Sequence, residues 1–338
     1  MSKNQEETAQ TQKSQLLGLK SVVSLARLTR IGIDRLREMA EKCKTSYPYE
    51  AWKEPKRSGQ GFRLIENPEP ALKRIQEQLN RVFQRLALPR IFHGCYRRTH
   101  IKSNAYPHIG SRHYESFDLA NYYFNINYKQ VYSGFIELGC SPPVARIITQ
   151  LTTTKGRVPQ GAPTSPIIAV IALLDIAGRL SDLCNQIGAT LTIYGDNICV
   201  SGSPHLRFHT HTMQDIIFQC GFKLRTNKRV SVSYDQPWPL PGVSLHLGEL
   251  DISLDDFEST KMIFLKCTVA GRAGLARKVC CRFRDKLSGL FYHYQWVGAA
   301  ESGPTARAES LKRLFLRIKW PSSYHRSACI GKKCLCEI

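Results

Sequence analysis

The chain has 338 residues, 42% of them apolar, and carries 48 Lys and Arg against 27 Asp and Glu, a formal net charge of +21. This content of apolar residues excludes a disordered tail, and no apolar run approaches the roughly 18 residues of a membrane helix. The polar N-terminal residues lack the apolar centre of a secretory signal. We therefore expect a globular cytoplasmic protein with no membrane association, whose twelve cysteines are mainly free thiols and whose excess charge favours a nucleic-acid partner.

The first half of the chain predicts helices interrupted by short strands. Residues 1–14 are typical of a disordered leader, and apolar residues recur at helical spacing over 15–40. The elements expected next are a strand over 62–65 ended by Asn67-Pro68, an amphipathic helix over 71–86, a strand over 114–119 and a helix over 131–138.

In the second half, Thr164 precedes Ser165 and Pro166, a hydroxyl cap followed by proline, which predicts a helix start. The apolar face of that helix would be Ile167, Val170, Ile171 and Leu174. Apolar runs over 190–194 and 198–201 are joined by Gly195-Asp196-Asn197, which predicts a hairpin. Further expected elements are a helix over 212–220, a strand over 222–233, a hairpin over 242–252 and helices from 259 to about 320. This order favours an α+β fold with a helical, basic C-terminal domain.

Two carboxylates occupy positions suited to chemistry. Asp196 lies at the predicted hairpin tip, and Asp118 ends another apolar strand. A Gly-Asp-Asn turn alone is commonplace. Two carboxylates at adjacent strand ends, however, can hold divalent metals about 4 Å apart, as phosphoryl transfer requires.

Several strings resemble the motifs of a known family. Residues 158–166, Val-Pro-Gln-Gly-Ala-Pro-Thr-Ser-Pro, resemble motif B of reverse transcriptases. Phe117-Asp118-Leu119 with Tyr122-Tyr123 resembles motif A, and Tyr194-Gly195-Asp196-Asn197 stands in the place of motif C. Upstream, Asn104-Ala105-Tyr106-Pro107-His108 resembles the Asn-Ala-x-x-His signature of bacterial retron reverse transcriptases. The resemblance covers about residues 60 to 245.

The resemblance implies a right-hand polymerase with fingers, a palm built on an antiparallel sheet, and a helical basic thumb. The expected divisions are a disordered leader over 1–14, an N-terminal helical extension over 15–60, fingers over 61–112, a palm with fingers elements over 113–255, an RNA-binding thumb over 256–320 and a cysteine-containing tail over 321–338.

The resemblance also implies roles for single residues. Asp118 and Asp196, with the backbone carbonyl of Leu119, would bind two Mg²⁺ ions, and Tyr123 would be the steric gate against a ribose 2′ hydroxyl. The other nucleotide-binding residues would be Arg63, Gln160, Gly161 and Lys228. Asn104 and His108 mark the family, and we expect them to brace a local turn.

The chain departs from the family pattern at two places. Asn197 stands where motif C has a second aspartate, so the site has one carboxylate fewer and is expected to tolerate or prefer Mn²⁺. Leu240-Pro241-Gly242 replaces the Val-Thr-Gly of motif E, and proline removes a backbone donor there.

The last quarter of the chain is basic and aromatic, with 16 Lys and Arg against 4 Asp and Glu over 261–338, an excess of +12. This composition predicts a groove for structured RNA. Its residues are Arg272, Arg277, Lys278, Arg282, Arg284, Lys286, Lys312, Arg313, Arg317 and Lys319, with Phe291, Tyr292, Tyr294 and Trp296. His325, Cys329, Cys334 and Cys336 could bind zinc, but their irregular spacing favours free thiols.

The resemblance implies an RNA-directed DNA polymerase that copies a cognate structured noncoding RNA from dNTPs into RNA-linked single-stranded DNA. Retron enzymes of this kind start from a guanosine 2′ hydroxyl and act in antiphage defence with an effector toxin. The alternative is a catalytically silent RNA-binding scaffold for the RNA and an effector, in which Asn197 records lost chemistry. A third hypothesis, untemplated polymerisation, is disfavoured by the string from Asn104 to His108. Intact Asp118, Tyr123, Gln160 and Lys228 favour the polymerase.

Overall fold

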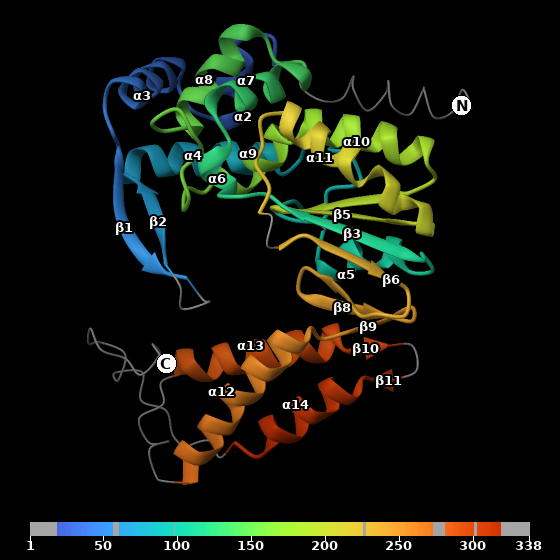
Figure 1. Cartoon of the computed structure of the whole chain (residues 1–338). Coiled ribbons are helices and arrows are strands. Elements are labelled where there is room, and N and C mark those ends of the chain that lie inside the picture. Colours follow the sequence, from blue (N-terminus) through green and yellow to red (C-terminus); the bar gives the residue numbers. More distant parts are fainter. Residues whose placement is uncertain are drawn as a thin grey trace. The chain divides into compact units, whose positions relative to one another are not determined.

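Figure 1 shows a computed structural model of the chain, which describes residues 19–56, 61–97, 99–225, 228–272, 281–300 and 303–318. The predicted leader and the cysteine-containing tail with its possible zinc ligands lie outside these residues. The chain divides into two compact units, Met1–Asn104 with His113–Ser231, and Ala105–Arg112 with Val232–Ile338.

The first unit begins with two helices, α2 (Val22–Thr29) and α3 (Ile33–Thr45). The helical spacing expected as one stretch is broken at Arg30, whose left-handed φ of 56° ends α2. Strands β1 (Tyr49–Pro55) and β2 (Phe62–Pro68) follow as an antiparallel hairpin, of which the sequence pattern predicted only the second strand.

The apolar helix α9 (Ser165–Ala172) packs against α7 (Tyr128–Glu137) and α10 (Leu174–Gln186). Helix α8 (Pro142–Thr152) packs against α7, α3 and α4 (Pro70–Phe83). Helix α7 starts three residues before its predicted start, because Asn127 and Gln130 form a reciprocal capping box there.

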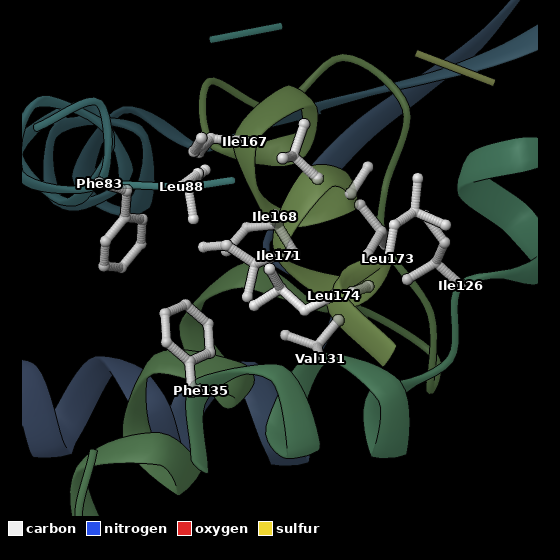
Figure 2. Packing of buried hydrophobic residues seen from close by; sticks show 14 of the residues in the cluster. Phe83, Leu88, Ile126, Val131, Phe135, Ile167, Ile168, Ile171, Leu173 and Leu174 are labelled. Carbon is white, nitrogen blue, oxygen red and sulfur yellow. The ribbon is translucent and has the colours of Figure 1, made fainter. Parts of the chain in front are cut away.

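The core of this unit is built on α9. Figure 2 shows Ile167, Ile168 and Ile171 of α9 packed with Phe83 and Phe135 from neighbouring helices. All four residues of the predicted apolar face are buried, as expected, and Ile168 is buried as well, so burial extends around α9. Burial of each such side chain stabilises the fold by about 1.5–3 kcal/mol.

Helix α9 starts at the predicted place with a proline in its first turn, but the expected hydroxyl cap was wrong. Thr164 is the residue before the helix, but its side chain makes no cap hydrogen bond. Its Oγ1 is buried without a hydrogen-bond partner. The hydroxyl of Ser165 donates instead to the carbonyl of Pro159, which fastens the preceding loop to the helix start.

A four-stranded sheet has the order β4-β5-β3-β6, with β3 (His113–Asp118), β4 (Thr190–Tyr194), β5 (Asn197–Gly202) and β6 (Val230–Ser233). The hairpin of β4 and β5 matches the prediction, and β3 pairs antiparallel with β5. Helix α10 packs on β4 and against α11 (Thr210–Gln219), which follows the short helix η2 (Pro204–His209). The strand expected over 222–233 is confined to β6, and Leu224 makes only an isolated bridge with Leu119.

The second unit contains η1 (Tyr106–His108), a three-stranded sheet and helices. The sheet is β7 (Trp238–Leu240), β8 (Val243–His246) and β9 (Glu249–Asp251), and the predicted hairpin is confirmed as β8 and β9. The helices are α12 (Leu254–Arg272), α13 (Cys281–Val297) and α14 (Ala306–Leu316), with a small hairpin of β10 (Ala299–Ala300) and β11 (Gly303–Pro304) before the last. None of the helices among the described residues has the length and apolar character needed to cross a membrane.

The aromatic residues of the C-terminal helices divide between core and surface. The rings of Phe291 and Phe315 stack with centroids 4.3 Å apart, and Tyr294 is buried. Tyr292 and Trp296 are 69% and 41% exposed. Of the basic residues predicted to line an RNA groove, Arg277, Lys278 and Lys319 lie outside the described residues, and of Arg272, Arg282, Arg284 and Lys286 only the backbone is described.

Candidate active site

Strand pairing brings the two predicted metal-binding carboxylates together. Asp118 ends β3 opposite Asn197, the first residue of β5. The backbone N–H of Leu119 donates to the carbonyl of Asp196 over 2.8 Å. Gly195 has a φ of +62°, which allows the tight turn at the tip of the hairpin. The end of β3 and the tip of the β4–β5 hairpin therefore lie side by side, and we call this place the metal-binding edge.

Asp118 lies in an unusual electrostatic environment. It is 6% exposed, with Arg225 Nη1 3.1 Å from Oδ1 and Lys228 Nζ 3.7 Å from Oδ2. The pKa of Asp118 is raised above its ordinary value, first by burial and then by the charge of Asp196, while Arg225 and Lys228 oppose the rise. Oδ1 accepts no well-aligned hydrogen bond, although the arginine is near.

This pair fits a divalent cation. Two carboxylates are held close enough to repel, and one buried carboxylate oxygen has no hydrogen bond to satisfy it. Oxygen ligands of this kind are those that Mg²⁺ prefers. Asn197 Nδ2 donates to Asp196 Oδ1 over 3.4 Å, so a neutral amide lies where a third carboxylate would add charge. No group of three or more His, Cys, Asp and Glu is placed for metal binding in the described part of the chain.

Tyr123 lies close to this edge on the short helix α6 (Tyr122–Asn125). Its ring centroid is 5.2 Å from that of Tyr122. Its pKa is raised by burial, and the charges of Cys95 and Asp196 add to the effect. The phenol of Tyr123 therefore stays protonated, and its ring packs beside Tyr122.

Gln160 and Gly161 lie against strand β2. The carbonyl of Gln160 accepts from the N–H of Glu66 over 2.7 Å. Gly161 has a φ of +118°, and a Cβ there would lie 2.9 Å from Ile65 Cγ2. Arg63 is exposed on the same strand, and within the described residues no hydrogen bond or ion pair joins it to Asp118 or Asp196.

The two family-signature residues lie in different units. Asn104 is buried in α5 (Ile101–Ala105), and its carbonyl accepts from Thr192 Oγ1 over 3.5 Å. The side-chain oxygen and nitrogen of Asn104 are buried without a hydrogen-bond partner. Burial raises the pKa of the neighbouring Cys199 thiol to about 11. His108 is buried in η1 and lines a small cavity together with Trp238.

Two features of the site were not predicted from the sequence: Arg225, and the polar contacts of the buried Glu115. Arg225 donates its backbone N–H to the Asp118 carbonyl over 2.9 Å, in addition to its side-chain approach. Glu115, which precedes Asp118 on β3, accepts from Ser231 Oγ over 2.7 Å and lies 3.1 Å from His113 Nε2. The run of basic residues around Lys228 was a signal for Arg225, whereas nothing local indicated the Glu115 contacts.

Gly94 allows a neighbouring segment to approach the hairpin tip. His93 donates its N–H to the carbonyl of Ile193 over 2.8 Å, so this segment runs beside β4. A Cβ at Gly94 would lie 2.8 Å from the backbone nitrogen of Gly195. A side chain at this position would therefore push on the turn that carries Asp196.

Residues 54–265, more than half of the chain, match the reverse transcriptase (RNA-dependent DNA polymerase) family. The retron Mx65 reverse transcriptase of Myxococcus xanthus is 32% identical over 199 residues, which cover 53% of this chain and 45% of that protein. The retron Mx162 reverse transcriptase of the same organism is 29% identical over 246 residues, 63% of this chain and 50% of that protein. The chain thus spans about half the length of these two relatives.

The retron Ec73 reverse transcriptase of Escherichia coli is 24% identical over 303 residues, which cover 85% of this chain and 93% of that protein. Among solved structures, telomerase from Candida albicans in complex with a fragment of telomeric RNA matches with a TM-score of 0.50 and 12% identity, over 80% of this chain and 55% of that one. This likeness concerns the fold alone. The resemblance seen in the sequence motifs and the expected α+β polymerase fold are both confirmed.

Proposed function

Because the chain belongs to the reverse transcriptase family, we propose that it is a retron RNA-directed DNA polymerase that copies its cognate noncoding RNA into RNA-linked single-stranded DNA. The observation that carries the proposal is the junction of β3 with the β4–β5 turn, where Asp118 and Asp196 meet with Lys228 3.7 Å from Asp118. The retron relatives and the string from Asn104 to His108 support the finer assignment.

In this proposal the carboxylates of Asp118 and Asp196, with the Leu119 carbonyl, hold the divalent metal. Bound Mg²⁺ would make the primer hydroxyl more acidic and neutralise charge on the leaving pyrophosphate. The basic side chains Arg225 and Lys228 also act at this site. Arg225 lies beside one carboxylate oxygen of Asp118 and Lys228 beside the other, and both limit the charge repulsion between Asp118 and Asp196.

The remaining roles concern the incoming nucleotide. Tyr123, half-buried on α6 and held neutral, presents a rigid ring where a ribose 2′ hydroxyl would collide. Gly161 lets its loop lie against β2, where a Cβ would meet Ile65, and in this proposal the loop lines the pocket for the nucleotide and template. Arg63, exposed on β2, is free to bind triphosphate oxygens through paired, charge-assisted hydrogen bonds.

Partners follow from the same resemblance. We propose that the protein binds a structured noncoding RNA, retains the DNA product, uses dNTPs, and joins an effector toxin in antiphage defence. Lys312 and Arg313 of α14 and Arg317 directly after it, with the exposed Tyr292 and Trp296 of α13, supply charge and stacking surfaces for the RNA.

The second candidate function is a catalytically silent RNA scaffold. Asn197 favours it, because the amide removes one negative charge from the site. The intact contacts of Asp118 with Lys228 and Arg225 favour the polymerase.

The nucleic acid that co-purifies with the protein distinguishes the two. The protein is expressed with its native flanking DNA, and the extracted nucleic acid is treated with RNase or with DNase. A discrete RNase-resistant DNA, absent from an Asp118→Ala variant, is the expected result. RNA alone, identical in wild type and variant, would contradict the polymerase and favour the scaffold.

A further inference from the structure

A buried ion pair lies away from the metal-binding edge. Arg157 donates from Nη1 to Glu66 Oε2 over 2.6 Å and from Nη2 to Oε1 over 3.0 Å. Tyr47 also donates its hydroxyl to Oε1 over 2.8 Å. The Glu66 side chain is fully buried and that of Arg157 is 15% exposed. A two-pronged, desolvated pair of this kind is strong and admits little change in geometry.

Arg157 is presented by a rigid turn. Thr154 and Arg157 exchange backbone hydrogen bonds of 2.8 and 3.0 Å, and the two residues between them, Lys155 and Gly156, have φ angles of +49° and +76°. Lys155 Nζ lies 3.8 Å from the ring centroid of Tyr47, so the turn also holds the residue that contacts Glu66.

Strand β2 contacts the loop of Gln160 and Gly161 through Ile65 and Glu66. The N–H of Glu66 donates to the carbonyl of Gln160, and Ile65 packs on Gly161 so closely that a Cβ there would lie 2.9 Å from it. Side chains alternate along a strand, so Arg63 shares the face of Ile65 and Glu66 the opposite face. The ion pair therefore anchors the strand from the side away from Arg63.

The same guanidinium reaches a third element. Arg157 Cζ lies 3.9 Å from the ring centroid of Phe124, the residue after Tyr123 on α6. One side chain thus connects β2, the loop before Gln160 and the helix of the predicted steric gate.

We infer that Glu66 and Arg157 are positioning residues of the nucleotide pocket. Their ion pair fixes the spacing between the strand that carries Arg63 and the loop that carries Gln160 and Gly161, before a dNTP enters. Neither residue forms an ion pair or hydrogen bond with Asp118 or Asp196 within the described residues. The inference rests on the proposed polymerase function.

The test is steady-state primer extension on an RNA template with varied dNTP. Glu66→Gln and Arg157→Gln are expected to raise the KM for dNTP about tenfold, with kcat within about threefold of wild type and template affinity unchanged. Arg157→Lys keeps the positive charge but cannot donate two parallel hydrogen bonds to Glu66, so its KM for dNTP should lie between those of wild type and Arg157→Gln. The double variant Glu66→Gln/Arg157→Gln leaves no unpaired buried charge, so it should unfold near the wild-type Tm and still show the raised KM for dNTP.

The matched control is Glu69→Gln, which removes an exposed pair with Lys42 from the same end of the hairpin. Hydrogen exchange at the Glu66 amide, which bonds to Gln160, gives a readout without catalysis and should quicken in Glu66→Gln but not in the control. If the wild type extends primers and no variant alters KM, the inference is overturned while the proposed function stands. If the wild type makes no DNA, the proposed function fails and an unchanged exchange rate at Glu66 overturns the inference separately.

Discussion

Gly94→Ala should damage catalysis more than stability. A Cβ at Gly94 would lie 2.8 Å from Gly195 N and 3.2 Å from two backbone atoms of Tyr194, whereas ordinary contact begins near 3.4 Å. The turn must therefore move by about 0.6 Å at its closest point. Overpacking of this size costs about 1–3 kcal/mol. Because reacting groups must be held within about 0.5 Å, we expect kcat to fall about 10- to 100-fold.

Primer extension and thermal unfolding of the same preparations check this prediction. Gly178→Ala is the matched control, since Gly178 is an exposed helical glycine of α10 and a Cβ added there would meet nothing within 4 Å. Alanine there should stabilise the helix by about 0.5–1 kcal/mol and leave kcat unchanged. A Gly94→Ala variant with wild-type kcat would show that the hairpin tip does not hold Asp196 as described.

Three further outcomes are expected. Asn197→Asp adds a carboxylate beside Asp196 and should raise extension in Mg²⁺ relative to Mn²⁺, which metal titrations measure; an unchanged ratio would count against a charge-limited site. Tyr123→Val should lower discrimination between dNTPs and rNTPs about 10- to 100-fold in single-nucleotide incorporation, and unchanged discrimination would remove Tyr123 as the gate. Burial lowers the pKa of His93 below 6.5, so on acidification the unfolded chain binds a proton that the folded chain does not, and the folded state loses stability as pH drops below 6.5. His93→Gln should reduce the fall in Tm between about pH 7 and 5. An unaltered dependence of Tm on pH would refute this prediction.

Local sequence signals were sufficient for the hairpin that carries Asp196. Two short apolar runs around a glycine turn allow few other structures, and β4 and β5 begin and end within a residue or two of the predicted ranges. The nearness of Asp118 required the family resemblance, because the pairing of β3 with β5 joins residues far apart in the chain.

The sequence could not reveal contacts whose partners are distant and whose residue types are ordinary. Glu66 and Arg157 are 91 residues apart, and each alone is an unremarkable charge in a strand or loop. The cap expected at Thr164 failed for a related reason, since tertiary packing buries its hydroxyl without a partner while Ser165 bonds to Pro159. Residue propensities describe a short segment of the chain, whereas these contacts depend on which distant residues the tertiary fold places next to that segment.

Primer extension on an RNA template by wild type, Asp118→Asn and Asp196→Asn is the most direct test of the proposed metal-binding edge. We expect DNA synthesis by the wild type in Mg²⁺ or Mn²⁺, and a loss of about a thousandfold or more in each variant, with RNA binding unchanged. DNA synthesis at the wild-type rate by either variant would contradict the assignment of Asp118 and Asp196 as the catalytic pair.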